Sequence, residues 1–180
     1  SFSKYSLGVS KKINELNEDQ KLTRGHVIKF INQVAAKSAK PILLATSKAI
    51  LKSLEGELNI NIHTINYNNL RGLDRFKDLD TAIILGREQP AAEDIESLAR
   101  CLRSRTKERG LPYGGYKKKS VFYKMQHDSR SLRPQNIWYH PDHLSSQILK
   151  QIREEELEQA IDRLRLVYNE EPKYIFILCD

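Results

Sequence analysis

Apolar residues in the first half of the chain alternate between helical spacing and short continuous runs. A stripe at three- and four-residue spacing predicts an amphipathic helix over about 24–38, with Thr23 as its cap. A second helix, after the first strand, is predicted through about Leu54 and ends at Gly56. The predicted strands of this half are 42–45, 60–65 and 80–86. This order of helices and buried strands is typical of an α/β domain with a parallel sheet.

The second half of the chain returns to helical and strand spacing on both sides of a basic segment. The predicted elements are a helix over 91–103, strands at 121–125 and 137–140, a helix over about 143–168 and a last strand at 174–179. Pro90 starts the first of these helices, in which Ile95, Leu98 and Leu102 are expected to face inward.

Together these elements predict one three-layer α/β domain over 23–180 with a mainly parallel sheet. Residues 1–22 are polar and rich in lysine, and we expect them to form an N-terminal arm. In 103–119 glycine, proline and basic residues replace the apolar spacing, so a basic insertion is predicted at about 103–140. Because the chain lacks an initial Met and stops directly after an apolar run, we expect it to be a piece of a longer protein.

Charge and cysteine usage narrow the class of partner and the compartment. The chain has 30 Lys and Arg against 23 Asp and Glu, and its net charge of +7 favours an anionic partner such as nucleic acid or a nucleotide. The two cysteines lie outside any CxxC or Cys/His spacing, which predicts a reducing, cytoplasmic location and no metal site. No apolar run reaches transmembrane length, so we expect no membrane partner.

The basic segment has the composition of a nucleic-acid-binding element. Lys117, Lys118 and Lys119 are consecutive cations that can neutralise phosphates. The aromatic residues that can stack on exposed bases in and after this segment are Tyr113, Tyr116, Tyr123 and Trp138. A solvated run of charge is the alternative interpretation.

Other chemistries lack their motifs in this chain. Residues 110–117 miss the Walker spacing, because Tyr116 stands where that motif requires lysine after its second spaced glycine. No Gly-x-Ser-x-Gly elbow is present. His140 and His143 flank a helix start where Asp142 can serve as the cap, and no third metal ligand is close in sequence.

The stretch 155–168 combines an apolar helical stripe with a polar pair. Gln159 and Arg163 are four residues apart and therefore share a helix face. Because arginine offers a fixed fork of donors to phosphate oxygens, this pair can sense a phosphate. A solvated polar face on a packed helix is the alternative.

Three stretches, in this order, resemble motifs of the second RecA-like domain of superfamily-two helicases. Residues 41–48, Pro-Ile-Leu-Leu-Ala-Thr-Ser-Lys, resemble the motif IV region. Residues 66–86 resemble motif V and the strand after it. Residues 158–165 resemble motif VI, usually written Gln-x-x-Gly-Arg-x-x-Arg. The resemblance covers about 41–180.

The similarity is closest to helicase-like proteins of phages, plasmids and integrated elements in bacteria. In those proteins a His-Pro-Asp segment, here 140–142, precedes a helix carrying Glu-Leu-x-Gln-Ala-Ile-x-Arg, here 156–163. The chain departs from the family pattern in motif VI. Asp162 stands at the family's glycine, and Arg165 follows Arg163 by two residues instead of three.

The resemblance implies a RecA-like fold of the P-loop NTPase type that lacks its own Walker A. ATP and Mg²⁺ would be bound mainly by an upstream RecA-like domain of the same protein. The implied catalytic residues are Arg163 as an arginine finger, Gln159 as its coupling partner, and Arg165. The implied contacts to nucleotide and nucleic acid are Asn68, Asn69, Arg71, Gly72, Thr46, Ser47 and Lys48. The partner would be nucleic acid, with DNA favoured over RNA.

Two other functions stay open. A nucleic-acid-binding or assembly module with a degenerate helicase fold would account for Asp162 and for the displaced Arg165. An unrelated doubly wound domain that binds a small nucleotide would bind ATP by itself.

Overall fold

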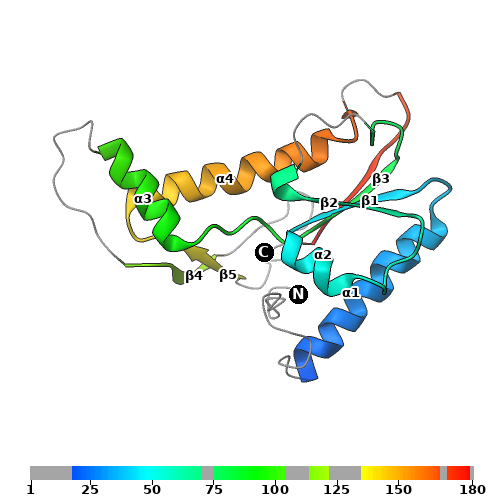
Figure 1. Cartoon of the computed structure of the whole chain (residues 1–180), viewed down its shortest axis with the longest axis horizontal. Coiled ribbons are helices and arrows are strands. Elements are labelled where there is room, and N and C mark those ends of the chain that lie inside the picture. The colour runs from blue at the N-terminus through cyan, green and yellow to red at the C-terminus, as the bar shows by residue number, and fades with distance from the viewer. Residues whose placement is uncertain (1–17, 70–74, 104–113, 122–134, 167–169, 179–180) are drawn as a thin grey trace, which may run out of the picture. The chain divides into compact units, whose positions relative to one another are not determined.

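The computed structural model describes residues 18–69, 75–103, 114–121, 135–166 and 170–178 (Figure 1). They fall into two compact units. The first comprises the chain up to Glu88 together with Glu155–Cys179, and the second comprises Gln89–Glu154. The basic insertion predicted at about 103–140 falls inside the second unit.

A four-stranded parallel sheet forms the centre of the first unit. Its strands are β1 (Ile42–Thr46), β2 (Ile62–Asn66), β3 (Thr81–Leu85) and β6 (Tyr174–Leu178), in the spatial order β2-β1-β3-β6. Every residue of β1 and of β3 is buried, because these two strands lie inside the sheet. Strands that are covered on both faces are continuous apolar runs. The four predicted strands of this unit are confirmed to within two residues at each end.

Helices cover both faces of this sheet, so the first unit has three layers (Figure 1). On one face, α1 (Glu18–Lys37) and α2 (Lys48–Leu54) pack on the alternate strand residues that include Leu44 and Ile83. On the other face, the end of α4 (His143–Asp162) and the segment before β3 pack on the set that includes Ala45 and Ile84. The prediction of an α/β fold with a mainly parallel sheet is confirmed at this level.

Helix α1 starts before the predicted cap. It begins at Glu18, so Thr23 lies within the helix and donates its hydroxyl to the Asp19 carbonyl at 2.8 Å. Two acidic residues, Glu18 and Asp19, occupy the first turn, where a carboxylate is favoured by the helix dipole. The prediction of this helix is confirmed, but its start lies six residues before the predicted one.

The second unit combines helices with a short antiparallel ribbon. Its elements are α3 (Ala92–Arg103), β4 (Lys117–Val121), β5 (Gln135–Tyr139) and the first part of α4. Strands β4 and β5 pair from Lys117 opposite Tyr139 to Val121 opposite Gln135. The three lysines of the predicted basic insertion therefore lie in a strand, which the sequence did not predict. The strand predicted at 121–125 lies outside the described residues except for its first position.

Helix α3 presents a different face from the predicted one. Ile95 is buried as expected, but Leu98 and Leu102 are about half exposed. The buried positions beside Ile95 are Glu96 and Ala99. The inward face is thus partly polar, and Glu96 is its centre.

Helix α4 ends at Asp162, earlier than the predicted end at 168. Two tight backbone bonds follow, from Leu164 N to Ile161 O at 3.1 Å and from Arg165 N to Asp162 O at 2.9 Å. Arg165 adopts a positive φ of 52°, a region that terminates helices.

Candidate nucleic-acid interface

The β4/β5 ribbon of the second unit places lysines beside aromatic rings. The Lys118 ammonium lies 4.5 Å from the centroid of the Trp138 ring, directly across the ladder. The Lys119 ammonium lies 5.1 Å from the centroid of the Tyr139 ring. Lysine against an aromatic face is attractive because the ring quadrupole is negative there. All three predicted lysines are exposed.

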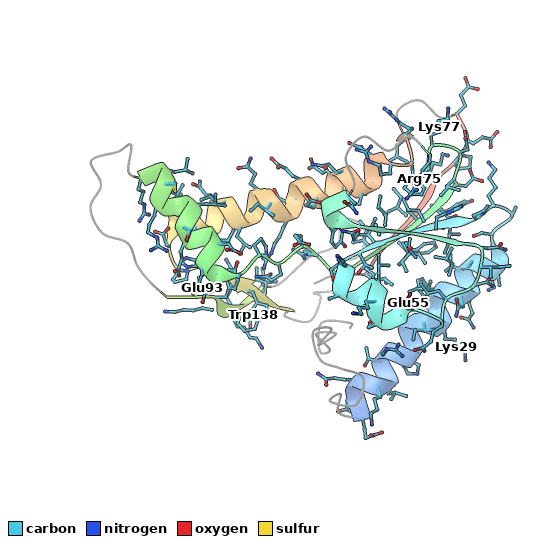
Figure 2. The ribbon with its side chains drawn as sticks, in the orientation of Figure 1. Lys29, Glu55, Arg75, Lys77, Glu93 and Trp138 are labelled. Atoms are coloured by element: carbon cyan, nitrogen blue, oxygen red, sulfur yellow. The ribbon has the colours of Figure 1, made fainter. Side chains whose placement is uncertain are left out.

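The period of two along a strand assigns these pairs to opposite faces of the ribbon. Lys118 and Trp138 lie on one face, while Lys117, Lys119 and Tyr139 lie on the other. Each face therefore carries at least one cation and one aromatic ring. Figure 2 labels Trp138 on β5.

A buried carboxylate anchors both strands at one end of the ribbon. Glu96 Oε1, on α3, accepts hydrogen bonds from the Gly114 and Gly115 amides at 3.4 and 3.2 Å, just before β4. The same oxygen lies 2.9 Å from His140 Nε2, just after β5. Gly115 has a φ of +56°, which favours glycine and lets two successive amides converge on one anion.

Hydrogen bonding assigns the tautomer of His140, whose ring is buried. Its Nδ1 accepts the Asp142 amide hydrogen at 3.1 Å, so that nitrogen carries no proton. The proton of the neutral ring therefore sits on Nε2, which donates to Glu96. These bonds from His140 and from the two glycine amides lower the pKa of Glu96, although burial opposes them.

Asp142 joins the ribbon end to the start of α4. Burial opposes its charge, but hydrogen bonds from the Ser145 amide and hydroxyl and from Arg103 outweigh that effect and lower its pKa. The Ser145 bonds are 2.9 and 2.8 Å long and cap the helix. Arg103, at the end of α3, lies 2.5 Å from the other carboxylate oxygen. Two helices and both strands are thereby connected by ionic and hydrogen bonds.

Two further side chains hold the ribbon. Tyr116 donates its hydroxyl to the Pro90 carbonyl at 2.8 Å, and its ring meets His140 edge-on at 6.2 Å. Burial raises the pKa of this phenol. Arg153, on α4, donates to the Trp138 carbonyl at 3.0 Å and also to the Gln89 side chain. Tyr116 is thus part of the anchor, and its predicted role in base stacking stays a prediction.

The predicted phosphate-sensing pair lies at the end of α4, in the first unit. Arg163 Nε donates to the backbone carbonyl of Gln159 at 3.2 Å. The Gln159 side-chain oxygen is buried and has no hydrogen-bond partner among the described residues. Arg165 is exposed, two residues further on. The structure thus brings the Arg163 side chain to the backbone of Gln159, one turn earlier in the chain.

The residues predicted at the strand ends have different environments. Thr46 is fully buried and donates its hydroxyl to the Leu85 carbonyl at 2.6 Å. Ser47 caps α2 by accepting the Ile50 amide, and Lys48 is exposed. Asn69 donates to the Asn66 side chain at 3.1 Å.

Arg71, Gly72 and Tyr113 lie outside the described residues. The backbone of Asn68 belongs to a short 3-10 helix over Tyr67–Asn69. Arg75, labelled in Figure 2, follows the part of this loop that lies outside the described residues. Its guanidinium lies over the Phe76 ring, 4.7 Å from the ring centroid.

Sequence reasoning missed the anchor of the ribbon. Glu96 follows Ile95 and precedes Ala99 by three residues, so it continues the buried stripe of α3, yet an acidic residue is normally assigned to the surface. The sequence identified Asp142 as the cap of the final helix, which its bonds to Ser145 confirm, but it gave His140 no structural role. An acidic residue in an apolar stripe, together with a buried histidine elsewhere, is the signal that could have found this pair.

Comparisons with protein-family models, with curated proteins and with solved structures found no match. Within the described ranges, no three His, Cys, Asp or Glu side chains are grouped as metal ligands. None of the described helices is both long and apolar enough to span a membrane.

The anchor predicts a loosening of the ribbon in acid. Because the pKa of folded Glu96 lies below its ordinary value, its stabilising contribution is complete above about pH 4.3 and is lost as the pH falls through the lower folded value. The emission of Trp138, followed from pH 6 to 2.5, should therefore change in this range. Glu96→Gln should shift or remove this change, and it should also loosen the ribbon at neutral pH.

Glu93→Gln is the matched control, since Glu93 is exposed on the same helix. It should leave the emission profile unchanged. Superimposable profiles for Glu96→Gln and the wild type would contradict the assigned role of Glu96.

Proposed function

We propose that this chain is the C-terminal, RecA-like half of an ATP-dependent nucleic-acid helicase or translocase. The observation that carries the proposal is that the three helicase-like stretches converge on one hydrophobic cluster. Leu43 and Ala45 come from the first stretch, Ala82 and Ile84 from the second, and Ala160 and Leu164 from the third. In the helicases that the chain resembles, these motifs act together. Here one hydrophobic core, on one face of a parallel sheet, holds the three stretches.

Arg163 is the proposed arginine finger. It lies directly after the last residue of α4 and is partly exposed. A guanidinium in this position would contact the terminal phosphate of ATP held by the upstream domain. ATP, once bound there, supplies the phosphoryl group. Arg163 would neutralise the negative charge that develops on the transferred phosphoryl group. Ala160 and Leu164, packed on the sheet, would link this contact to the core.

The proposed nucleic-acid contacts are the exposed lysines of β4 and, at the end of β1, Ser47 and Lys48. The carboxyl ends of parallel strands are where open α/β sheets bind ligands. The lysines would neutralise the backbone phosphates of DNA or of RNA. DNA is the favoured partner.

A non-catalytic nucleic-acid-binding or assembly module is the second candidate function. One observation favours it: Arg163 Nε donates to the carbonyl of its own helix at Gln159. An arginine held in this way has to release that bond before all its donors can point at a phosphate. Asp162, at the family's glycine, adds a negative charge beside it.

Arginine substitution tests the catalytic role in a protein that contains both RecA-like domains. Arg163→Ala should lower nucleic-acid-stimulated ATP turnover by about 10³-fold or more, because an arginine finger contributes at least this much. ATP binding should change little. Arg163→Lys should restore only part of the turnover, since lysine keeps the charge but loses the fork.

The control variant Arg100→Ala removes an arginine from α3 and should leave turnover unchanged. Wild-type turnover in Arg163→Ala would support the non-catalytic module.

The salt dependence of binding tests the basic ribbon. Replacing Lys117, Lys118 and Lys119 by glutamine should reduce the slope of log affinity against log salt by about 2–3, since each phosphate contact contributes roughly 0.7–0.9. Anisotropy of a labelled oligonucleotide measures this slope.

The matched control is a triple glutamine variant of Lys29, Lys37 and Lys52, which are exposed on α1 and α2. Figure 2 labels Lys29 on α1. It removes the same charge from the first unit. An equal loss of slope in both triple variants would show that the ribbon contributes only general charge.

A further inference from the structure

Trp138 is the only tryptophan of the chain, and 43% of it is exposed. Tryptophan carries a large apolar ring that usually buries most of its surface. The two hydrophobic clusters of the described residues do not contain Trp138. Its ring is therefore presented to solvent on β5 (Figure 2) and does not serve as packing for a core.

The backbone below this ring is firmly held. The Trp138 carbonyl accepts a hydrogen bond from Arg153, and His140 lies buried against Glu96 two residues later. His140 directly follows β5, so its bond to Glu96 holds the end of the strand that carries Trp138. A rigid backbone under an exposed ring is what a stacking surface requires, since little ordering entropy remains to be lost on binding.

One lysine contacts the exposed ring. Lys118 lies over it, whereas Lys117 and Lys119 extend from the opposite face of the ribbon. In single-stranded nucleic acid an unstacked base and its phosphate are close together. A base that replaces the Lys118 ammonium on the ring face would bring its phosphate near that ammonium, so the two side chains can contact both groups. In a duplex the base faces are covered by neighbouring bases, so an indole has no face to stack on.

We propose that the Trp138–Lys118 face of the ribbon is a binding site for single-stranded nucleic acid, with a base stacked on the Trp138 indole and a phosphate paired with Lys118. This site rests on the proposed nucleic-acid function and specifies its substrate class. Binding needs no particular base, because every base has a π-face.

Fluorescence of the 180-residue chain reports on this site directly, since Trp138 is its only tryptophan. Oligothymidylate should quench the emission in a saturable way. Duplex of the same length and inorganic polyphosphate, which has no bases, should quench it little. In a separate anisotropy assay with a labelled single strand, Trp138→Leu should bind about 5- to 150-fold more weakly, which corresponds to roughly 1–3 kcal/mol per stacked base.

Three controls separate stacking from structural damage. Trp138→Phe keeps an aromatic face and should retain most of the affinity. Tyr174→Leu removes an aromatic residue, 58% exposed, from β6 in the first unit and should bind as the wild type does. Circular dichroism should show unchanged secondary structure in Trp138→Leu.

The outcomes distinguish this site from the proposed function on which it rests. Single-strand binding without quenching, and with wild-type affinity in Trp138→Leu, would overturn the stacking site and leave the proposed function standing. Equal or stronger binding and quenching by duplex would overturn the single-strand assignment. The absence of binding by any nucleic acid at low salt would overturn both.

Discussion

A buried carboxylate requires hydrogen-bond donors, and Glu96 obtains them from both ends of the β4/β5 ribbon. The Gly114 and Gly115 amides precede β4, and His140 follows β5, so one oxygen of α3 holds the two strands together. Strand β4 has three consecutive lysines and only one apolar residue, Val121. Without this anchor the repulsion among the lysines and the ordering entropy of the strands would oppose its formation. The position of Trp138 depends on the same bonds.

The two units of the chain are stabilised by different interactions. The first unit contains both hydrophobic clusters of the described residues, one on each face of a parallel sheet. The second unit relies on an ionic and hydrogen-bonded network that runs from Glu96 through His140 and Asp142 to Arg103. Polar networks of this kind fix geometry more than they add stability. Apolar packing therefore stabilises the α/β unit, whereas hydrogen bonds and ion pairs fix the ribbon within the second unit.

The sequence predicted those parts that are determined by apolar periodicity. Strands β1 and β3 are uninterrupted apolar runs, and their burial on both faces follows from it. Strand β4, Lys-Lys-Lys-Ser-Val, has no alternation of apolar residues, so its sequence does not predict a strand. Pairing with β5 and the Glu96 anchor hold it in place. Its lysines are exposed, and the strand that carries them was not predicted. Leu98 and Leu102 were predicted as core because they continue the apolar spacing of Ile95. They are about half exposed, since the buried face of α3 includes Glu96, which apolar spacing does not reveal.

The central claim is that this chain completes an ATPase whose phosphate-binding half is an upstream domain. Titration calorimetry of ATP with Mg²⁺ tests it most directly, performed on these 180 residues alone and on a protein that adds the upstream domain. The account predicts no tight ATP binding by the chain alone and clear binding by the two-domain protein. Tight, stoichiometric binding of ATP by the chain alone would contradict the account and indicate a self-sufficient nucleotide-binding domain.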